Sequence, residues 1–276
     1  MADHAHSSDP GVQRQLDRLA MLSPGRDVLG LERITRLLDR LGNPQHDLPP
    51  VFHVAGTNGK GSTCAFLRAA LEASGRRVHV YTSPHLVRFN ERIRVADRLI
   101  EDDLLAELLE EVLSVADDIG PSFFEATTAA AFLAFARTPA DACVIEVGLG
   151  GRLDATNMIE HPAVCGIAQL ALDHQAFLGD RIETIAAEKA GIAKAGAPLL
   201  RSRYGRPRAL EITPEEPEVE GGHRRGPGKR GVVAQIRREE EVPRDRAGDH
   251  HHHADQHRPN DDSHAPPSPA PKGGTS

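Results

Sequence analysis

The chain of 276 residues has no tryptophan, only two tyrosines and three cysteines, and no excess of basic residues. Cys64, Cys143 and Cys165 are too few and too scattered for a disulfide framework, and their apolar neighbours indicate buried, reduced thiols. The formal net charge of -7 argues against a general nucleic-acid binder. No apolar run approaches the roughly 20 residues of a membrane span, and the start, MADHAHSSDPGVQRQ, lacks the basic and apolar regions of a signal peptide. We therefore expect a cytoplasmic protein with no nucleic-acid or membrane partner.

The composition changes sharply along the chain. From Arg206 to Ser276 there is no aromatic residue of the Phe, Tyr or Trp type, and beyond Val242 there is no Val, Leu, Ile or Met. So little apolar surface cannot offset the entropy of ordering the backbone. We predict a folded domain over residues 1–205 and a disordered low-complexity tail over residues 206–276. The histidines at 250–253 could bind transition metals weakly, or they reflect compositional bias in such a tail.

Strand and helix patterns alternate through the first part of the chain. Helical spacing of apolar residues predicts helices over 12–22, 28–42, 62–74, 99–120, 124–137 and 181–196. Apolar runs predict strands within 51–55, 77–83, 142–151 and 163–174. In the third helix we expect Phe66, Leu67, Ala70 and Leu71 to lie on one side. The alternation indicates the α/β class, with a mostly parallel sheet flanked by helices and ligands beyond the carboxyl ends of its strands.

A glycine-rich segment, GTNGKGST, links the strand at 51–55 to the next helix. It departs from the usual phosphate loop, G-x-x-x-x-G-K-[ST], because only two residues separate Gly56 from Gly59 and Gly61 follows Lys60. The glycines still allow backbone N–H groups to turn toward one centre at the positive end of a helix. A bland glycine-rich turn is the alternative, but such a turn does not need a lysine.

Six motifs occur in a fixed order: HVAGTNGKGST, YTSPHLVRFNERIRV, FFEATTAAAF, EVGLGGRLDATN, LDHQAFLGD and IAAEKAGI. From about Leu19 to Leu200 the chain resembles the folylpolyglutamate synthase/dihydrofolate synthase family of Mur-ligase-like, ATP-dependent amide ligases. The resemblance implies a P-loop-type central ATPase domain. It also implies a C-terminal Rossmann-like glutamate ligase domain, for which this sequence shows no strands or helices after Leu200. A reading-frame change near Arg201 to Arg206 would explain the tail, and a true truncation is the alternative.

The resemblance also implies roles for individual residues. It assigns the phosphates of ATP to Thr57, Asn58, Gly59, Lys60, Gly61 and Ser62, and Mg²⁺ to Ser83, Glu146 and His174. It assigns the pterin-bearing substrate to Ser122, Phe123, Phe124, Glu125, Leu153, Asp154 and Ala155, with Met21 to Pro24 as a weaker candidate segment. It assigns catalysis to Lys60, His174 and Lys189, the last as a lysine carboxylated on its amine.

Each assignment has a plainer alternative in the residues themselves. Ser83 before a proline is typical of a turn that ends a strand. Glu146 ends an apolar run, so a buried carboxylate is expected there, and an arginine could pair with it instead of a metal. Phe123 and Phe124 could pack in the core, and Lys189 could lie on a solvated helix face.

The resemblance predicts a monomeric ligase that joins L-glutamate to dihydropteroate or a reduced folate through an acyl phosphate, with little turnover by this chain alone. One alternative is a non-catalytic remnant that binds nucleotide. Another is a Mur ligase of peptidoglycan synthesis, which TSPHLVRFNERI and EVGLGGRLDATN disfavour.

Overall fold

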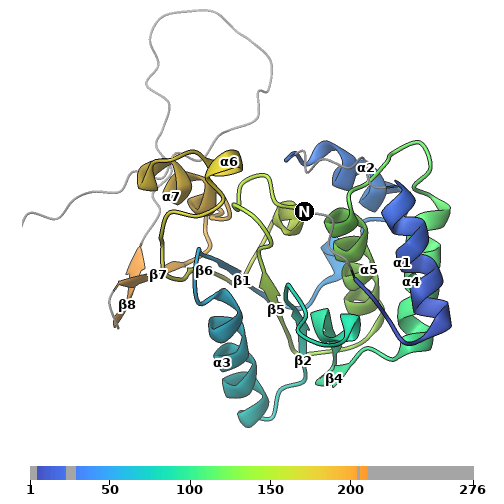
Figure 1. The fold of residues 1–276 in the computed structure, drawn as a ribbon. Helices are drawn as coiled ribbons and strands as arrows, with labels where there is room; N and C mark the ends of the chain where they lie inside the picture. The colour runs from blue at the N-terminus through green and yellow to red at the C-terminus, as the bar shows by residue number, and fades with distance from the viewer. Residues whose placement is uncertain (1–4, 23–28, 204–205, 211–276) are drawn as a thin grey trace, which may run out of the picture. The chain divides into compact units, whose positions relative to one another are not determined.

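The structure is a computed structural model that describes residues 5–22, 29–203 and 206–210 (Figure 1). The chain divides into two compact units after Gln235, and every described residue belongs to the first of them. Within the described ranges, no helix has the length and apolar character needed to span a bilayer.

The elements follow the predicted alternation closely. The α-helices are α1 (Pro10–Leu22), α2 (Glu32–Arg40), α3 (Lys60–Ala73), α4 (Asp102–Ser114), α5 (Phe123–Arg137), α6 (Gln175–Leu178) and α7 (Ile182–Ala190). The strands are β1 (Val51–Ala55), β2 (Val78–Tyr81), β3 (Ile93–Val95), β4 (Arg98–Leu99), β5 (Ala142–Glu146), β6 (Val164–Ile167), β7 (Leu199–Arg203) and β8 (Arg206–Leu210). Short 3₁₀ turns span Pro44–Asp47, Phe89–Arg92 and Ala155–Met158.

The strands form one mixed sheet in the order β4-β3-β2-β5-β1-β6-β7-β8. Pairing is parallel from β2 through β5, β1 and β6 to β7, and antiparallel at both ends of the sheet. The prediction of a mostly parallel sheet flanked by helices is therefore confirmed. Strand β1 lies between β5 and β6, so the crossover from β5 to β6 passes it and leaves a switch point at its carboxyl end.

The central strand β5 shows how the sheet divides the core. Cys143 and Ile145 pack into the large apolar cluster that contains the buried faces of α1, α2, α4 and α5, whereas Val144 packs on the opposite face with Cys64 of α3. Successive side chains of a strand point to opposite faces, so a run that is apolar throughout is the expected sequence of a strand covered on both sides. Figure 1 shows α3 on one face of the sheet and α1, α4 and α5 on the other.

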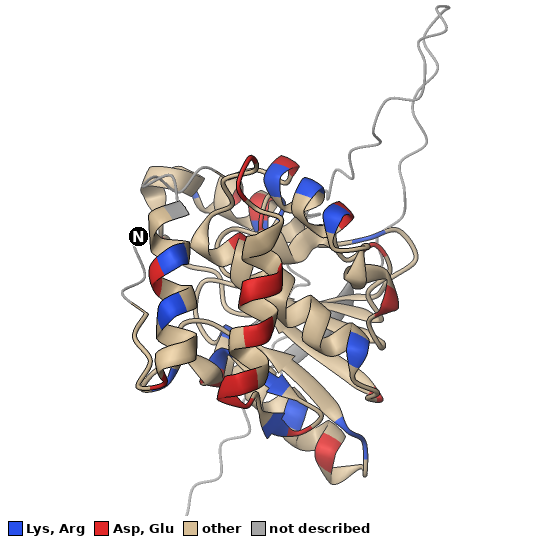
Figure 2. Ribbon diagram, turned by 90° about the vertical axis from the view of Figure 1, so that its right-hand side faces the viewer, with Lys and Arg blue, Asp and Glu red and all other residues tan. Residues whose placement is uncertain are grey.

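Helix α3 covers its face of the sheet with fewer residues than expected. Cys64 is buried and Leu67 and Leu71 are partly buried, whereas Phe66 is 77% exposed. The side of α3 that contacts the sheet runs through positions 64, 67 and 71, so Phe66 and Ala70 lie outside that contact. Helix α4 is amphipathic in the ordinary way, and its acidic residues lie along the solvent side (Figure 2).

The sequence pattern gives little indication of the strands at the two ends of the sheet. The hairpin of β3 and β4 lies in a stretch with no clear alternation, and β7 begins at the apolar end of the predicted domain. Residues 206–210, assigned by composition to the tail, form β8 and pair antiparallel with β7. An edge strand offers unpaired N–H and C=O groups with which a neighbouring segment can pair, whatever its composition. The rest of the predicted tail, including the histidines at 250–253, lies outside the described residues.

Candidate functional site

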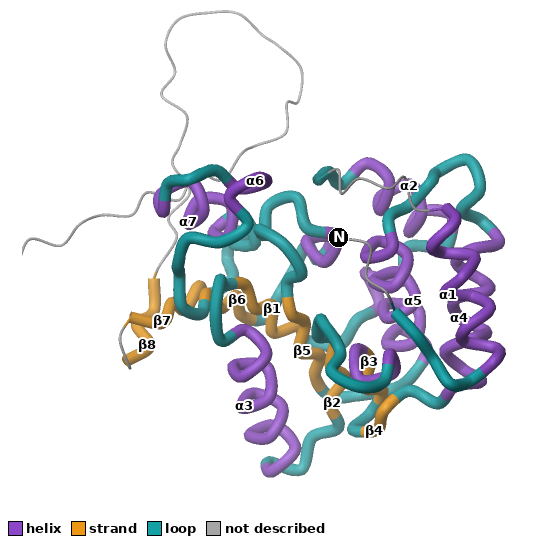
Figure 3. Tube along the Cα trace, in the orientation of Figure 1, coloured by secondary structure: helices purple, strands orange, loops and turns teal. Residues whose placement is uncertain are grey.

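The residues predicted for nucleotide and metal binding follow four neighbouring strands. Because β2, β5, β1 and β6 are parallel, their carboxyl ends meet at one edge of the sheet, here called the rim (Figure 3). Ser83 follows β2, Glu146 ends β5, and Lys60 follows β1. His174 lies in the segment after β6 and opens the short helix α6. The topology thus brings the expected residues of four separate motifs to the same edge.

The loop after β1 is shaped as a phosphate cradle. Gly59 has a φ of 78°, in the left-handed region that favours glycine, and it caps α3 without a side-chain hydrogen bond. A Cβ on Gly56 would lie 2.7 Å from that of Ala168, so this position has no room for a side chain. The amides of Lys60, Gly61 and Ser62 open the helix and have no acceptor within it. They lie at the positive end of the helix dipole, an arrangement that can receive an anion.

Thr57 and Asn58 are hydrogen-bonded to the segment after β6. Both backbone N–H groups donate to the carbonyl of Gln169, at 2.8 Å and 3.1 Å, and the Thr57 hydroxyl donates to the carbonyl of Ala171. These hydrogen bonds hold the loop against the segment after β6. They fix the position of the loop, and the assignment of both residues to the phosphates of ATP stays a prediction.

Lys60 folds back over its own loop. Its Nζ donates to the carbonyls of Gly56 at 3.1 Å and Thr57 at 3.3 Å. Its charge also lowers the pKa of Glu146 and of Lys189, which places the ammonium within electrostatic reach of both neighbouring groups. A flexible ammonium at this position can exchange carbonyl partners for phosphate oxygens.

Glu146 is a buried carboxylate with little to balance its charge. The residue is 4% exposed, and burial raises its pKa to about 7 against the opposing effects of Lys60 and of the Ser83 N–H, which donates to the carboxylate. In the part of the chain that the structure describes, no arginine pairs with it, so the ion-pair alternative is not supported. A carboxylate held in this way fits a divalent cation, which would supply the missing charge.

His174 is the least constrained member of the expected metal set. Its side chain is 46% exposed, and its Nε2 lies 3.7 Å from Oδ2 of Asp173. Its φ of 51° places it in the left-handed region. Among the described residues no group of three or more His, Cys, Asp and Glu side chains could by itself enclose a metal. A Mg²⁺ ion here would therefore rely on phosphate oxygens and water for most of its ligands, as Mg²⁺ commonly does.

Lys189 is buried, at 4% exposure, so its alternative assignment to a solvated helix face is wrong. Burial lowers its pKa to about 8, and the positive charge of Lys60 adds to the effect, while Asp173 and Asp154 oppose it. Attack on CO₂ requires the neutral amine, and the lowered pKa increases the share of that form near physiological pH. The site residue thus has the chemistry that carboxylation needs.

The segment at 122–125 begins α5 and is engaged in packing. Ser122 and Glu125 form a reciprocal capping box, and the Glu125 carboxylate also pairs with Arg33 at 2.9 Å. The Phe123 ring meets Phe89 edge to face, with centroids 5.9 Å apart. Phe124 lies so close to Gly148 that an added Cβ would sit 2.5 Å from the ring. Both rings remain partly exposed, so an edge of each is still open to a ligand.

In the segment at 153–155 the side chains are mostly buried. Asp154 is 3% exposed and binds groups of its own loop, and Ala155 is 4% exposed and joins the main core cluster. Only Leu153 of the three is partly exposed. Of the weaker candidate segment, Met21 lies at the end of α1, and Ser23 and Pro24 lie outside the described residues.

Two features of the site had no signal in the sequence. Tyr81, whose hydroxyl lies 3.1 Å from those of Thr127 and Thr128, joins β2 to α5 beneath the rim. His53 of β1 contacts Thr156 of the 3₁₀ turn at Ala155–Met158, and nothing in a strand of apolar residues marks that partner.

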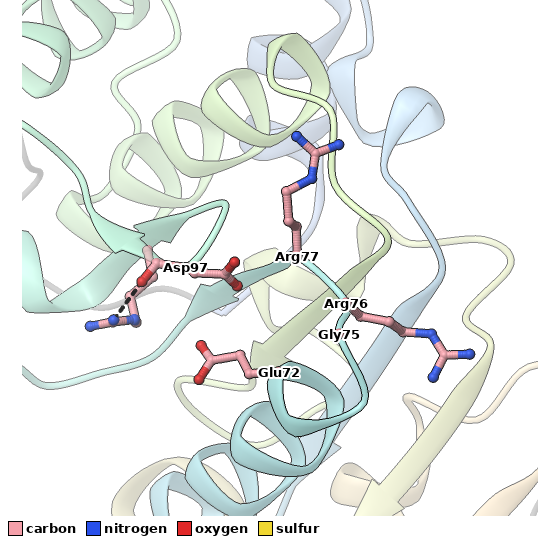
Figure 4. A pocket seen from close by; sticks show the side chains of 6 residues that line it. Glu72, Gly75, Arg76, Arg77 and Asp97 are labelled. Carbon is pink, nitrogen blue, oxygen red and sulfur yellow. Dashed lines mark hydrogen bonds between the residues drawn. The ribbon is translucent and has the colours of Figure 1, made fainter.

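Two hollows lie at the opposite, amino-terminal edge of the sheet. One, of about 380 Å³, is lined by Glu72, Gly75, Arg76, Arg77, Arg94 and Asp97, and Figure 4 shows Arg76 and Arg77 pointing away from one another. The other, of about 280 Å³, is formed around Gln45 to Val51 and Ile159 to His161. Neither contains a residue of the rim.

Comparison with curated proteins gives a consistent set of relatives, although no family model matches the chain. It is 45% identical over 175 residues to a dihydrofolate synthetase of Saccharomyces cerevisiae, covering 62% of this chain and 41% of that protein. It is 43% identical over 196 residues to a dihydrofolate synthase/folylpolyglutamate synthase of Bacillus subtilis, covering 68% of this chain and 45% of that protein. The chain thus spans less than half the length of these relatives.

Comparison with solved structures gives enzymes of the same kind. Escherichia coli FolC in complex with DHPP and ADP superposes with a TM-score of 0.66 at 40% identity, covering 70% of this chain and 46% of that one. A bifunctional folylpolyglutamate synthase/dihydrofolate synthase with Mn, AMPPNP and L-glutamate bound gives 0.63 at 39% identity, with the same coverage of each chain. By sequence and by fold together, the matched two thirds of this chain is therefore related to the dihydrofolate synthase/folylpolyglutamate synthase family.

Proposed function

We propose that this chain carries the ATP-binding and Mg²⁺-binding part of a ligase that joins L-glutamate to dihydropteroate or to a reduced folate. The observation that supports this most strongly is the convergence of Lys60, Ser83 and Glu146 at one rim, beside a helix that opens with free amides. The names of the relatives and the bound molecules of the similar structures supply the substrate class.

The reaction has two steps. A carboxylate oxygen of the pteroate or folate attacks the γ-phosphorus of ATP, and the bond from that phosphorus to the bridging oxygen breaks, which gives an acyl phosphate and ADP. The amine of glutamate then attacks the acyl carbon, loses a proton, and expels inorganic phosphate as the amide forms. The charge changes fall on phosphate oxygens, so the enzyme's part is mainly positioning and electrostatic stabilisation.

Different residues near the rim would bind the phosphates, the metal and the pterin. The amides at the start of α3 and the Lys60 ammonium hold and neutralise the phosphates. Glu146, with the Ser83 hydroxyl and His174, would hold Mg²⁺, which would supply positive charge beside the phosphates. Lys189, once carboxylated, would present an anion to the same region. The partly exposed edges of Phe123 and Phe124 and the Leu153 side chain would contact the pterin.

A second candidate function is nucleotide binding without amide synthesis. It is favoured by the rim, where the residues assigned to the phosphates and the metal come together. Amide synthesis needs more than this, because an acyl phosphate survives only where water is excluded. A peptidoglycan ligase of the Mur type is not supported, since the relatives named here are folate enzymes.

One experiment separates the candidates. The purified chain is titrated with ATP in the presence of Mg²⁺ by calorimetry, and then incubated with ATP, labelled glutamate and either dihydropteroate or tetrahydrofolate. Hydroxylamine in a parallel reaction traps any acyl phosphate as a hydroxamate. Binding with labelled amide or hydroxamate supports the ligase, binding with neither supports the nucleotide-binding candidate, and no binding of ATP contradicts both.

A further inference from the structure

A buried carboxylate holds the loop between β5 and the following 3₁₀ turn in one shape. Oδ2 of Asp154 accepts from the Leu149 N–H at 2.8 Å, and Oδ1 accepts from the N–H of Thr156 at 3.0 Å. The Gly148 N–H also donates to this carboxylate. Three donors from both ends of the loop therefore converge on one side chain, which closes the loop on itself.

The hydroxyl of Thr156 continues this network to the centre of the sheet. Its Oγ1 lies 2.5 Å from Oδ1 of Asp154 and 2.9 Å from Nε2 of His53. A threonine hydroxyl has one proton, and it donates this proton in the hydrogen bond to the carboxylate. Thr156 must therefore accept a hydrogen bond from the Nε2–H of His53. The order of donation is thus His53 to Thr156 to Asp154, and all three side chains are 3% exposed or less.

The surroundings of His53 allow its ring to act as a hydrogen-bond donor to Thr156. It is fully buried in β1, and burial, with a smaller effect of the Lys194 charge, lowers its pKa to about 3, so the ring is neutral. Its Nδ1 is buried and has no hydrogen-bond partner among the described residues. The ring therefore joins the hydrogen-bond network through Nε2. Its position is set by β1, the strand that leads into the phosphate loop.

The loop lies between two residues of the proposed site. Glu146 immediately precedes it, and on its far side the Arg152 N–H donates to the carbonyl of Glu188 at 2.7 Å. Gly151 is packed so tightly that an added Cβ would lie 2.9 Å from Cα of Lys189. The shape of the loop therefore sets how Glu146 and Lys189 lie relative to one another.

We propose that His53 and Thr156 are positioning residues that orient the Asp154 carboxylate and, through the loop it closes, hold Glu146 and Lys189 in place for the nucleotide and its metal. The consequence for metal and nucleotide rests on the proposed function. The hydrogen-bond relay itself does not.

The relay is tested by hydrogen exchange, residue by residue, in the full chain. Thr156→Val removes the hydroxyl at nearly constant volume, and we expect the amides of Leu149 and Thr156 to exchange about tenfold faster, the equivalent of one net hydrogen bond. Thr156→Ser keeps the hydroxyl and should restore the wild-type rates. His53→Leu should resemble Thr156→Val, whereas His53→Gln, which keeps a donor near the position of Nε2, should be intermediate.

His79 supplies the matched control. It is equally buried in β2, where its Nε2 lies 2.9 Å from the Thr138 carbonyl, away from the rim. His79→Leu should lower global stability as His53→Leu does, yet leave the exchange of Leu149 and Thr156 unchanged at matched stability. Equal acceleration in both histidine variants would show a purely structural effect and overturn the proposal.

Two further measurements keep the inference open to contradiction if Thr156→Val folds poorly. Nitrogen NMR of the wild-type chain should find His53 neutral and protonated at Nε2, and a proton at Nδ1 would overturn the relay. The Mg²⁺ concentration that half-saturates ATP binding should rise severalfold in His53→Gln. If the wild-type chain shows the protected amides and the expected tautomer but binds no ATP, the relay is supported and the proposed function is wrong.

Discussion

The backbone N–H of Ser83, at the end of one strand, donates to the carboxylate of Glu146, at the end of the neighbouring strand. These residues are far apart in the sequence, and parallel pairing of β2 with β5 brings them together. The bond aims a buried carboxylate at the region above the phosphate loop. Four predictions follow from this geometry and from the packing around it.

Glu146 should make stability depend on pH. Its pKa is raised to about 7 from an ordinary value of 4.5, so between those values the folded chain binds a proton that the unfolded chain has lost. The contribution of Glu146 to folding stability is greatest below its ordinary pKa of 4.5, and it is lost as the pH rises through about 7. Glu146→Gln should therefore stabilise the chain by about 2 to 3 kcal/mol at about pH 8 and much less at about pH 5. Urea unfolding at both pH values measures this.

The control for that prediction is Glu110→Gln, on the exposed side of α4. It should change stability by less than about 0.5 kcal/mol at either pH. An equal response in the two variants would contradict the assignment of a strained, buried carboxylate to position 146.

Lys60 should matter for nucleotide binding and little for folding. Its Nζ is bonded to two carbonyls of its own loop, and a charge-assisted bond of this kind contributes about 1.5 to 3 kcal/mol when it reaches phosphate. Lys60→Met should weaken ATP binding by roughly 10-fold to 100-fold, measured by calorimetry. Lys194→Met removes another half-buried lysine and should leave ATP affinity within about twofold. Equal losses would argue against a phosphate contact at Lys60.

Lys189 should react with dissolved CO₂. With a pKa lowered to about 8, roughly half of its amine is neutral at about pH 8. Carbon NMR in labelled bicarbonate at that pH should show a carbamate signal that Lys189→Arg abolishes. Lys194→Arg is the matched control, since burial also lowers the pKa of Lys194. Loss of the signal in this variant, with retention in the first, would place the reactive lysine elsewhere.

Close backbone packing around the loop after β5 should make two glycines intolerant of a methyl group. A Cβ on Gly148 would lie 2.5 Å from the Phe124 ring, and one on Gly191 would overlap the Cβ of Arg152. Gly148→Ala and Gly191→Ala should each destabilise the chain by about 1 to 3 kcal/mol in thermal unfolding. Gly30→Ala meets no atom within 4 Å and should be nearly neutral. Neutral results at 148 or 191 would show that the loop can move aside.

Much of the rim was predictable because its residues carry strong local constraints. GTNGKGST needs glycine where a left-handed backbone and close packing allow no side chain, and Glu146 follows a run of apolar residues that must be buried. Other assignments could not be settled locally. Phe66 has the same chemistry as a core residue, and only the rotation of α3 against the sheet exposes it.

The sequence alone determined the alternation of strands and helices, the glycine-lysine loop and the burial of Glu146, since each depends on spacing or composition within a few residues. The tertiary structure decided the rest. It brought Ser83 to Glu146, buried Lys189 near Asp154, and brought His53 within hydrogen-bond distance of Thr156. Such contacts depend on strand order and register, and no single segment of the chain contains that information.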